Sequence, residues 1–167
     1  MPPLLILAAL YLPATRAHAD DGDAIVTDRP DFVESSDVVG RGRLQVETGV
    51  SHERSRMLGV RERSLATPTL LRIGLRDDWE LRLESDGRTV LKTQDEPGAP
   101  TRRQTGYADV SLGIKWHMQD GAGTRPSVGW LLHADIDSGS AAFRGNGVRP
   151  SLRMAAEWTC PAAIRWA

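Results

Sequence analysis

The chain has 167 residues, a length that suits one domain of ordinary size. Its formal net charge is −1, and its 21 basic and 22 acidic side chains are interspersed, so no basic region points to a nucleic-acid partner. Hydrophobic residues make up 40% of the chain and the mean hydropathy is −0.34. This balance excludes a bundle of membrane helices but not a membrane β-barrel, whose strands alternate apolar and polar residues.

Residues 1–19 have the layout of a secretory signal peptide. The apolar run Leu4–Leu12 is too short to cross a bilayer as a helix, and Ala17-His18-Ala19 has the small-x-small pattern of a cleavage site. No Lys or Arg precedes the apolar run, which leaves a buried strand or helix as the alternative interpretation. We expect residues 1–19 to direct export and residues 20–41 to form a periplasmic N-terminal segment.

Three carboxylates gather in this N-terminal segment, namely Asp28, Asp31 and Glu34. One hypothesis is a plug or periplasmic segment with a cation or partner site. The other is a polar lead-in in which Arg29 pairs with a neighbouring carboxylate, an arrangement that is common at protein surfaces and contributes little to stability. The sequence favours the second hypothesis.

A period of two dominates the chain between residues 42 and 159, which predicts strands with one apolar and one polar face. In the clearest case, Ile114 and Trp116 alternate with Lys115 and His117. Helical spacing fits these segments less well. The prediction is an all-β protein, an antiparallel meander of about six long strands. The six segments are 44–51, 65–75, 79–84, 107–118, 128–137 and 152–158.

Connections between the predicted strands alternate between short and long. The short ones are Arg76–Asp78 and Gln119–Arg125, whereas His52–Arg63, Ser85–Thr105 and Asp137–Val148 are long and polar. Outer-membrane barrels show this asymmetry because their periplasmic turns are short and their outer loops are long. Several segments also approach the ten residues that a tilted membrane strand needs.

Tryptophans provide an independent indication of a membrane barrel. Trp79, Trp116, Trp130 and Trp158 all lie on the apolar face and near the ends of strands that adjoin a short connection. An indole ring there would sit at the membrane–water interface. A soluble β-sandwich would instead scatter its tryptophans through a core between two stacked sheets.

The opposite, polar face carries charges of both signs. In a barrel these side chains would line a water-filled lumen and partly neutralise one another, which argues against strong selectivity for anions or cations. The lumen-facing candidates are Glu47, Arg72, Glu80, Arg82, Glu84, Asp109, Lys115, His117, His133, Asp135, Arg153 and Glu157.

No segment carries a complete catalytic or metal-binding motif. Asp135-x-Asp137-x-Gly139 lacks the third oxygen ligand and the closing Glu of a calcium loop. His117 and His133 share the polar face with serines, but no Gly-x-Ser-x-Gly elbow occurs. We expect no enzyme, no cofactor and no metal site.

Segments along most of residues 25–158 resemble a family of bacterial outer-membrane barrels that are labelled transporter-like or as proteins of a phenol-degradation (MetA) pathway. The most specific is Thr27-Asp28-Arg29-Pro30-Asp31-Phe32-Val33-Glu34-Ser35, and the others are Gly42–Gly49, Leu71–Leu75, Trp79–Leu83, Gly106–Val110 and Gly113–Trp116. The resemblance implies a porin-like outer-membrane protein that passes small molecules, among them aromatic compounds, without a cofactor. Its partners would be outer-membrane lipid, the outer-membrane assembly machinery and an unidentified solute.

Six predicted strands are fewer than the eight or so that a single-chain barrel needs. Residues 160–167 do not alternate cleanly, and Pro161 would interrupt a strand ladder. Cys160, the single cysteine, is expected to be a small, semi-apolar residue near the end of a strand. We therefore expect the N-terminal portion of a barrel, with a partial barrel over residues 42–159 and an irregular tail at 160–167 that marks truncation at the C-terminus. The alternative is a secreted soluble β-sandwich that binds a ligand or partner through its long loops.

Overall fold

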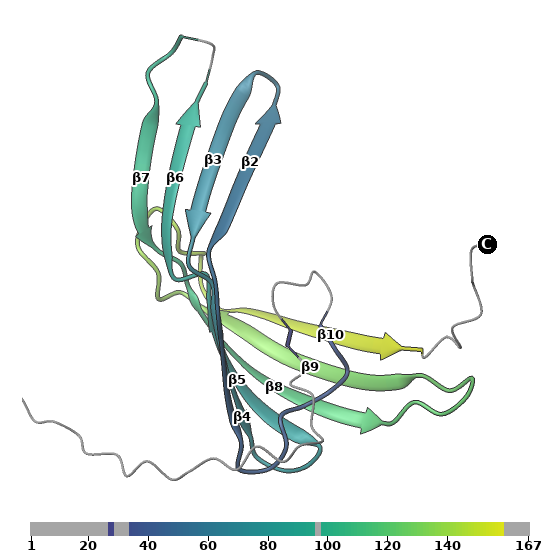
Figure 1. Cartoon of the computed structure of the whole chain (residues 1–167). Coiled ribbons are helices and arrows are strands. Elements are labelled where there is room, and N and C mark those ends of the chain that lie inside the picture. The colour runs from purple at the N-terminus through teal and green to yellow at the C-terminus, as the bar shows by residue number, and fades with distance from the viewer. Residues whose placement is uncertain (1–26, 29–33, 96–97, 159–167) are drawn as a thin grey trace, which may run out of the picture.

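A computed structural model describes residues 27–28, 34–95 and 98–158 (Figure 1). The signal peptide expected at 1–19, the Arg29–Val33 part of the N-terminal motif and the expected tail at 160–167, with Cys160 and Pro161, lie outside the described residues. Regular structure in the described part is entirely strand. Among these residues, no helix is long or apolar enough to cross a membrane.

Ten strands, all paired antiparallel, are present in the described residues, and they form two sheets. The six-stranded sheet has the order β1-β4-β5-β8-β9-β10 and the four-stranded sheet has the order β2-β3-β6-β7. The strands are β1 (Leu44–Thr48), β2 (Ser51–Met57), β3 (Val60–Ala66), β4 (Thr69–Gly74), β5 (Trp79–Ser85), β6 (Arg88–Gln94), β7 (Arg102–Tyr107), β8 (Val110–Gln119), β9 (Ser127–Ile136) and β10 (Arg149–Glu157).

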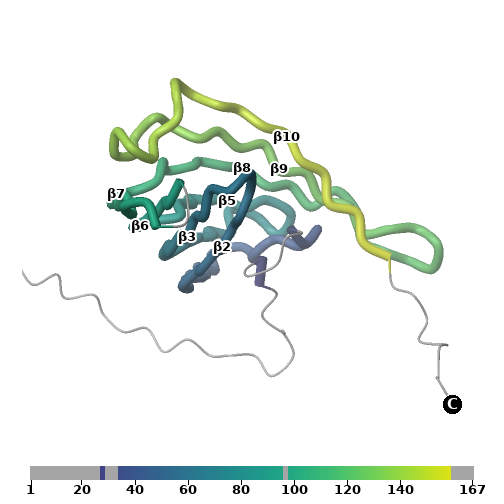
Figure 2. The backbone as a smooth tube through the Cα atoms, turned by 90° about the horizontal axis from the view of Figure 1, so that it is seen from above, coloured from purple at the N-terminus to yellow at the C-terminus, as the bar shows by residue number. Residues whose placement is uncertain are grey.

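Strands of the two sheets join end to end, so the chain makes six long passes. β1 leads into β2, β3 into β4, β5 into β6 and β7 into β8 after two intervening residues each, and every pass pairs with the one before it. The predicted antiparallel meander of about six long strands is therefore confirmed. The four-stranded sheet projects from one end of the six-stranded sheet (Figure 1), and the strands follow an open curve when seen from above (Figure 2).

Two of the three connections expected to be long polar loops are instead β-hairpins. Residues 52–63 fall almost entirely in β2 and β3, and residues 85–105 fall largely in β6 and β7. Leu58 and Gly59 form the first turn with φ values of 50° and 89°, as a two-residue hairpin turn requires. The loop prediction was wrong there because polar residues occupy most positions of these four strands, on both faces, which removes the alternation that reveals a strand. Only residues 137–148 form a long connection without a strand.

One face of the six-stranded sheet is apolar from edge to edge. Leu81 pairs with Ile114, Ile114 with Leu132, and Leu132 with Leu152, so aliphatic side chains lie side by side across four strands. This confirms the alternation predicted from the sequence. The face is open to the surroundings, since Leu132 is 54% exposed and Leu152 is 64% exposed.

Buried side chains of the six-stranded sheet are largely charged and lie on its other, polar face. Arg72 and Lys115 are each 1% exposed and Glu80 is 0% exposed. Few large apolar side chains of the described residues are buried as deeply; Leu70 and Leu131 are examples. A soluble protein normally buries its apolar side chains and exposes its charges, so this sheet has the reverse arrangement.

Tryptophans occupy the end of the apolar face that adjoins the short connections. Trp79 pairs with Trp116, which pairs with Trp130, and the rings of Trp79 and Trp116 stack with centroids 5.7 Å apart. Trp158, just after β10, donates its indole N–H to the carbonyl of Thr124 at 3.2 Å. The four indoles therefore lie at the end of the sheet that adjoins the short connections.

The two sheets do not stack on one another. The four-stranded sheet extends beyond one end of the six-stranded sheet and covers neither of its faces (Figure 1), and in the described residues only hydrogen-bonded neighbouring strands come into close backbone contact. A β-sandwich requires face-to-face packing of two sheets around a shared core. The sandwich considered as the alternative is therefore not the arrangement of these strands.

Candidate functional site

The N-terminal segment, described at residues 27–28 and 34–40, lies on the polar face of the six-stranded sheet. Ser36 donates its N–H to Glu157 Oε1 on β10 at 2.7 Å and its hydroxyl to Ser127 Oγ on β9 at 2.7 Å. Three residues later, Val39 donates its N–H to Glu80 Oε2 on β5 at 2.7 Å. The segment thus crosses strands that are far apart in the sequence and is anchored to them by side chains.

Two glycines allow the N-terminal segment to approach the sheet backbone closely. A Cβ atom at Gly129 on β9 would lie 2.6 Å from the carbonyl O of Ser36, and one at Gly74 on β4 would lie 2.0 Å from that of Gly40. A Cβ atom essentially never lies that close to an atom to which it is not bonded. Glycine at these two positions is therefore a condition for the segment to lie where it does.

Asp28 brings the segment's carboxylate to three cations of the sheet. Its Oδ2 accepts hydrogen bonds from Arg82 Nη1 at 2.8 Å and from Lys115 Nζ at 3.0 Å, and it lies 3.6 Å from Arg72 Nη1. Its Oδ1 accepts hydrogen bonds from the N–H and the hydroxyl of Ser35 at 3.0 and 2.7 Å. Asp28 is thus the point at which strands β4, β5 and β8 are tied to the N-terminal segment.

Arg72 links the other two carboxylates of the site. Its Nε and Nη2 donate to Glu80 at 2.9 Å each, a bidentate arrangement, and its Nη1 donates to Glu47 Oε1 at 3.3 Å. Nη2 also donates to the backbone carbonyl of Asp37 at 3.1 Å. Glu47 Oε2 in turn accepts the N–H of Asp28 at 3.0 Å, which closes the network.

We call this set the charge cluster: Asp28, Glu47, Arg72, Glu80, Arg82 and Lys115. Among the described residues it contains three cations and three carboxylates, and all six residues are buried. Burial alone would raise the pKa of Asp28, but the positive charges of Lys115, Arg72 and Arg82 and the hydrogen bond from Ser35 lower it to about 2. Asp28 is therefore ionised at neutral pH and offsets the positive charges around it.

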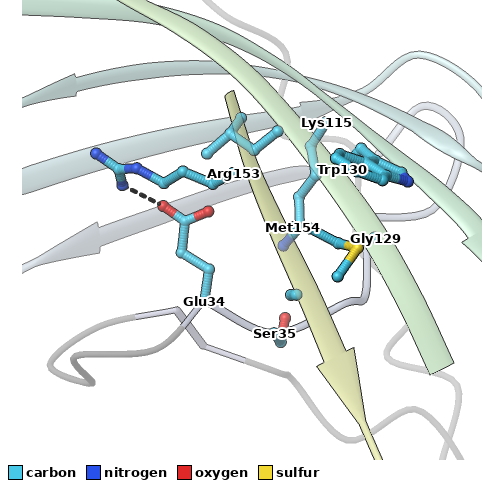
Figure 3. Close-up of a pocket in the computed structure, with 9 residues that line it drawn as sticks. Glu34, Ser35, Lys115, Gly129, Trp130, Arg153 and Met154 are labelled. Carbon is cyan, nitrogen blue, oxygen red and sulfur yellow. Dashed lines mark hydrogen bonds and ion pairs between the residues drawn. The ribbon is translucent and has the colours of Figure 1, made fainter. Parts of the chain in front are cut away.

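A pocket of about 310 Å³ opens beside the charge cluster, between the N-terminal segment and strands β9 and β10 (Figure 3). Its charged lining comes from Lys115, Glu34 and Arg153, and Arg153 Nη1 donates to Glu34 Oε1 at 2.9 Å. Arg153 Nη2 also lies 3.2 Å from His133 Nε2. A small polar molecule or a polar substituent could contact both signs of charge here.

Asp109, between β7 and β8, organises the long connection 137–148 at the other end of the sheet. Its carboxylate accepts the N–H groups of Gly139 and Gly145, both at 2.8 Å, and Arg149 Nη2 at 2.9 Å. The backbone hydrogen bonds from Gly145 and Gly139, followed by the bonds from Arg149 and Ser138, lower the pKa of Asp109 to about 2 against the opposing effect of burial. One carboxylate therefore ties both ends of this loop to the junction of β7 and β8.

Comparison with known proteins identifies a family. Residues 27–163 match the sequence profile of the family described as "Putative MetA-pathway of phenol degradation". The chain belongs to this family. No curated protein and no solved structure matches the chain. The match begins at Thr27, so in this MetA-family chain both the N-terminal segment and the whole charge cluster lie inside the family region.

The predicted polar-face residues of this MetA-family chain divide into three groups. Glu47, Arg72, Glu80, Arg82 and Lys115 meet in the charge cluster. A second group lies under or beside the N-terminal segment: His117, with Nδ1 3.0 Å from the Ser36 carbonyl O, together with His133, Arg153 and Glu157. Asp109 and Asp135 are joined through Arg149 at the outer end, and Glu84 lies on the same face, paired in register with Ser111.

Sequence reasoning missed the role of the N-terminal segment in this site. It favoured a lead-in with a local ion pair, whereas the Asp28 carboxylate binds cations of the sheet that lie 44 to 87 positions away in the sequence. The sequence offered one signal. Carboxylates gather at Asp28 and Glu34, and the polar faces of three predicted strands carry the cations Arg72, Arg82 and Lys115.

The two predicted histidines contact charged side chains rather than serine hydroxyls in the described residues. His117 Nε2 lies 3.0 Å from Asp120 Oδ1, and the contact of His133 is to Arg153; neither has a serine hydroxyl as partner in the described residues. Within the same part of the chain, no group of three or more His, Cys, Asp or Glu side chains could hold a metal ion.

Proposed function

We propose that this MetA-family chain forms part of the wall of an outer-membrane β-barrel that passes small molecules. The six-stranded sheet would span the bilayer, with its apolar face toward lipid and its polar face toward the lumen. The observation that carries the proposal is the reversed distribution of side chains, with Arg72, Glu80 and Lys115 buried and a continuous apolar face exposed. In water an exposed apolar face of this extent would drive association, whereas in lipid it is the stable arrangement.

The two ends of the sheet support a definite orientation in the membrane. Trp79, Trp116, Trp130 and Trp158 would form the aromatic girdle at the periplasmic interface, beside the short connections. The hairpins β2–β3 and β6–β7 and the loop 137–148 would then extend from the outer surface. Export by the signal peptide expected at residues 1–19 would deliver the chain to the periplasm.

The proposed transport is passive and involves no cofactor and no catalytic step. The N-terminal segment would lie inside the lumen as a plug fixed by the charge cluster, and the pocket beside Lys115, Glu34 and Arg153 would be the contact point for a solute. Charges of both signs in the pocket suit polar or zwitterionic solutes and phenols, whose hydroxyl can donate or accept a hydrogen bond. The family description favours aromatic compounds as the solute.

The proposal also requires partner strands for the two edge strands of the six-stranded sheet. In the described residues β1 and β10 each have one hydrogen-bonded neighbour, and they do not pair with each other. Lipid offers no hydrogen bonds to an open edge, so both strands must find partner strands in the membrane. The assembly machinery of the outer membrane would be needed for insertion.

Cell fractionation tests the proposal directly. We expect the full chain, expressed in a Gram-negative host, to be extracted from the outer-membrane fraction only by detergent and to migrate differently on gels before and after heating. Recovery as a folded protein in the soluble periplasmic fraction would overturn the proposal. Solute passage is tested by conductance or swelling of vesicles that contain the purified chain, with phenol and an aliphatic alcohol of similar size as the compared solutes.

A matched pair of variants separates a lipid-facing surface from a water-exposed one. Leu132→Arg places a cation in the middle of the apolar face, and Leu65→Arg places one on β3 of the four-stranded sheet; both leucines are about half exposed. If the apolar face contacts lipid, Leu132→Arg destabilises the inserted chain by about 2–4 kcal/mol and lowers its recovery, while Leu65→Arg has little effect. Equal, small effects of both substitutions would contradict a lipid-facing surface.

A further inference from the structure

One face of the four-stranded sheet carries a patch of positive charge. Arg54 pairs with Arg63, Arg63 with Lys92, and Lys92 with Arg103, so four cations stand side by side across β2, β3, β6 and β7. The next row on the same face begins with Arg56 opposite Arg61. We call these six exposed residues the cationic face.

No carboxylate offsets these charges on the same side in the described residues. Glu53 is opposite Ser64 and Glu62 is opposite Ser55, and both pairs point to the other side of the sheet. In the part of the chain that the structure describes, none of the six cations forms an ion pair. Like charges directly opposite each other destabilise a sheet, so the bare fold carries a cost that an anionic partner would remove.

Strand register places the cationic face on the same side as the apolar face. The β1–β4 ladder pairs Thr48 with Thr69 and the β2–β3 ladder pairs Ser51 with Ala66, which is the same register. Between them, the N–H of Gly49 donates to the carbonyl of Pro68 at 3.0 Å. Side chains therefore continue to alternate through this junction, and Arg54 and Arg63 lie on the side of the exposed apolar face.

The cations of the second hairpin, Lys92 and Arg103, lie on this side as well, because β6 pairs with β3. Lys92 is opposite Arg63 even though β6 follows β5 after a turn at Gly87, where φ is 62°. Moving outward from the tryptophan end, the same surface therefore changes from apolar rows to a row of four cations. An apolar band bordered by cations is the pattern expected of a surface that meets both lipid tails and lipid head groups.

We propose that the cationic face binds the phosphate groups of an anionic lipid leaflet. The inference rests on the proposed membrane function and adds to it a partner chemistry for the projecting sheet. Arginine suits this task because its planar guanidinium donates two parallel hydrogen bonds to phosphate oxygens. Neighbouring strands are about 4.8 Å apart, so the row of four extends over roughly 14 Å and can contact several adjacent head groups.

Vesicle binding tests the proposal with a charge-matched control. The full chain is inserted from detergent into phosphatidylcholine vesicles alone and into phosphatidylcholine vesicles with phosphatidylglycerol, and the detergent concentration that extracts it is measured. The test variant carries Arg54→Gln, Arg63→Gln and Arg103→Gln. The control carries Arg76→Gln, Arg102→Gln and Arg125→Gln, which removes the same charge from exposed positions outside the cationic face.

Anionic lipid is expected to strengthen retention of the wild-type and control chains, and high salt is expected to abolish the gain. The test variant should lose most of this gain in the extracting detergent concentration, because each basic residue near an anionic surface strengthens binding by about a factor of five or more. Both variants should still insert into neutral vesicles. Failure to insert there would count against the proposed membrane function, whereas a change seen only with anionic lipid concerns the cationic face. An equal response of the two variants, or equal stabilisation in neutral vesicles by inorganic phosphate, an oligonucleotide or an acidic peptide, would overturn the assignment to lipid.

Discussion

The long passes of the chain form two sheets in which charged side chains are arranged in opposite ways. In the six-stranded sheet, Arg72, Arg82 and Lys115 are buried and matched by Asp28, Glu47 and Glu80. In the four-stranded sheet, arginines and a lysine stand opposite one another without carboxylates on their side. The difference follows from a third element, because the N-terminal segment covers the first group and supplies Asp28.

Burial decides how much each charge matters. A buried ion whose partner is removed keeps its desolvation cost, whereas an exposed ion is solvated by water and screened by salt. Substitutions in the six-stranded sheet should therefore have large effects on stability, and those in the four-stranded sheet small ones. The following variants test this contrast.

Asp28→Ala should have the largest effect. It leaves Arg72, Arg82 and Lys115 buried with one carboxylate fewer, and we expect the free energy of unfolding of the full chain in detergent to fall by about 3–5 kcal/mol. Denaturant titration measures this loss. Glu53→Ala, at an exposed position in the four-stranded sheet, is the control and should cost less than about 0.5 kcal/mol. Similar losses for both variants would mean that Asp28 does not hold the cluster together.

Gly129→Ala should come next, because it separates the N-terminal segment from the sheet without changing a charge. The added Cβ would lie 2.6 Å from the Ser36 carbonyl O, and relief of that overlap is expected to cost about 1–3 kcal/mol. Gly49→Ala is the matched control, since a Cβ there meets no atom within 4 Å. Protease cleavage within the N-terminal segment should become faster in the first variant only. Unchanged cleavage would show that the segment does not depend on close approach at Gly129.

The pH dependence of stability should reveal Asp28 in its ionised form. Its pKa is about 2 in the folded chain and 3.8 ordinarily, so the folded state favours the carboxylate. The resulting stabilisation is complete above about pH 5 and is lost as the pH falls through 2, by about 2 kcal/mol in total. Unfolding of the wild type and of Asp28→Asn, measured across this range, should converge by that amount as the pH falls. Parallel curves would contradict the lowered pKa.

Arg63→Glu should have the smallest effect and the opposite sign. It places a carboxylate between Arg54 and Lys92, and we expect a gain of roughly 0.2–1 kcal/mol for each of the two pairs at low salt. Arg102→Glu, opposite Thr93, brings the same change of charge without a cation directly across and should be close to neutral. Thermal unfolding at low and high salt measures both variants. A loss of stability in Arg63→Glu would show that the cations are already compensated.

Local patterns in the sequence were enough to predict the faces of the six-stranded sheet. Lys115 faces the buried charges, and its neighbour Trp116 faces the exposed apolar surface. This alternation of a charged and an apolar residue is visible in the sequence. The hairpin strands were missed because a strand with two exposed faces shows no such contrast, as around Arg54. The pairing of Asp28 was missed because the N-terminal segment has no period that encodes where it lies. Only the folded sheet brings Arg72 and Lys115 to the same point.

The stacked indoles of Trp79 and Trp116 give the molecule a built-in optical reporter. Because the two rings come from different strands, their coupling exists only when β5 and β8 have reached their final register. A slip of one residue would send one ring to the opposite side of the sheet and abolish the coupled signal. Near-ultraviolet circular dichroism of the unlabelled chain can therefore follow strand alignment during folding, separately from the total content of β-structure.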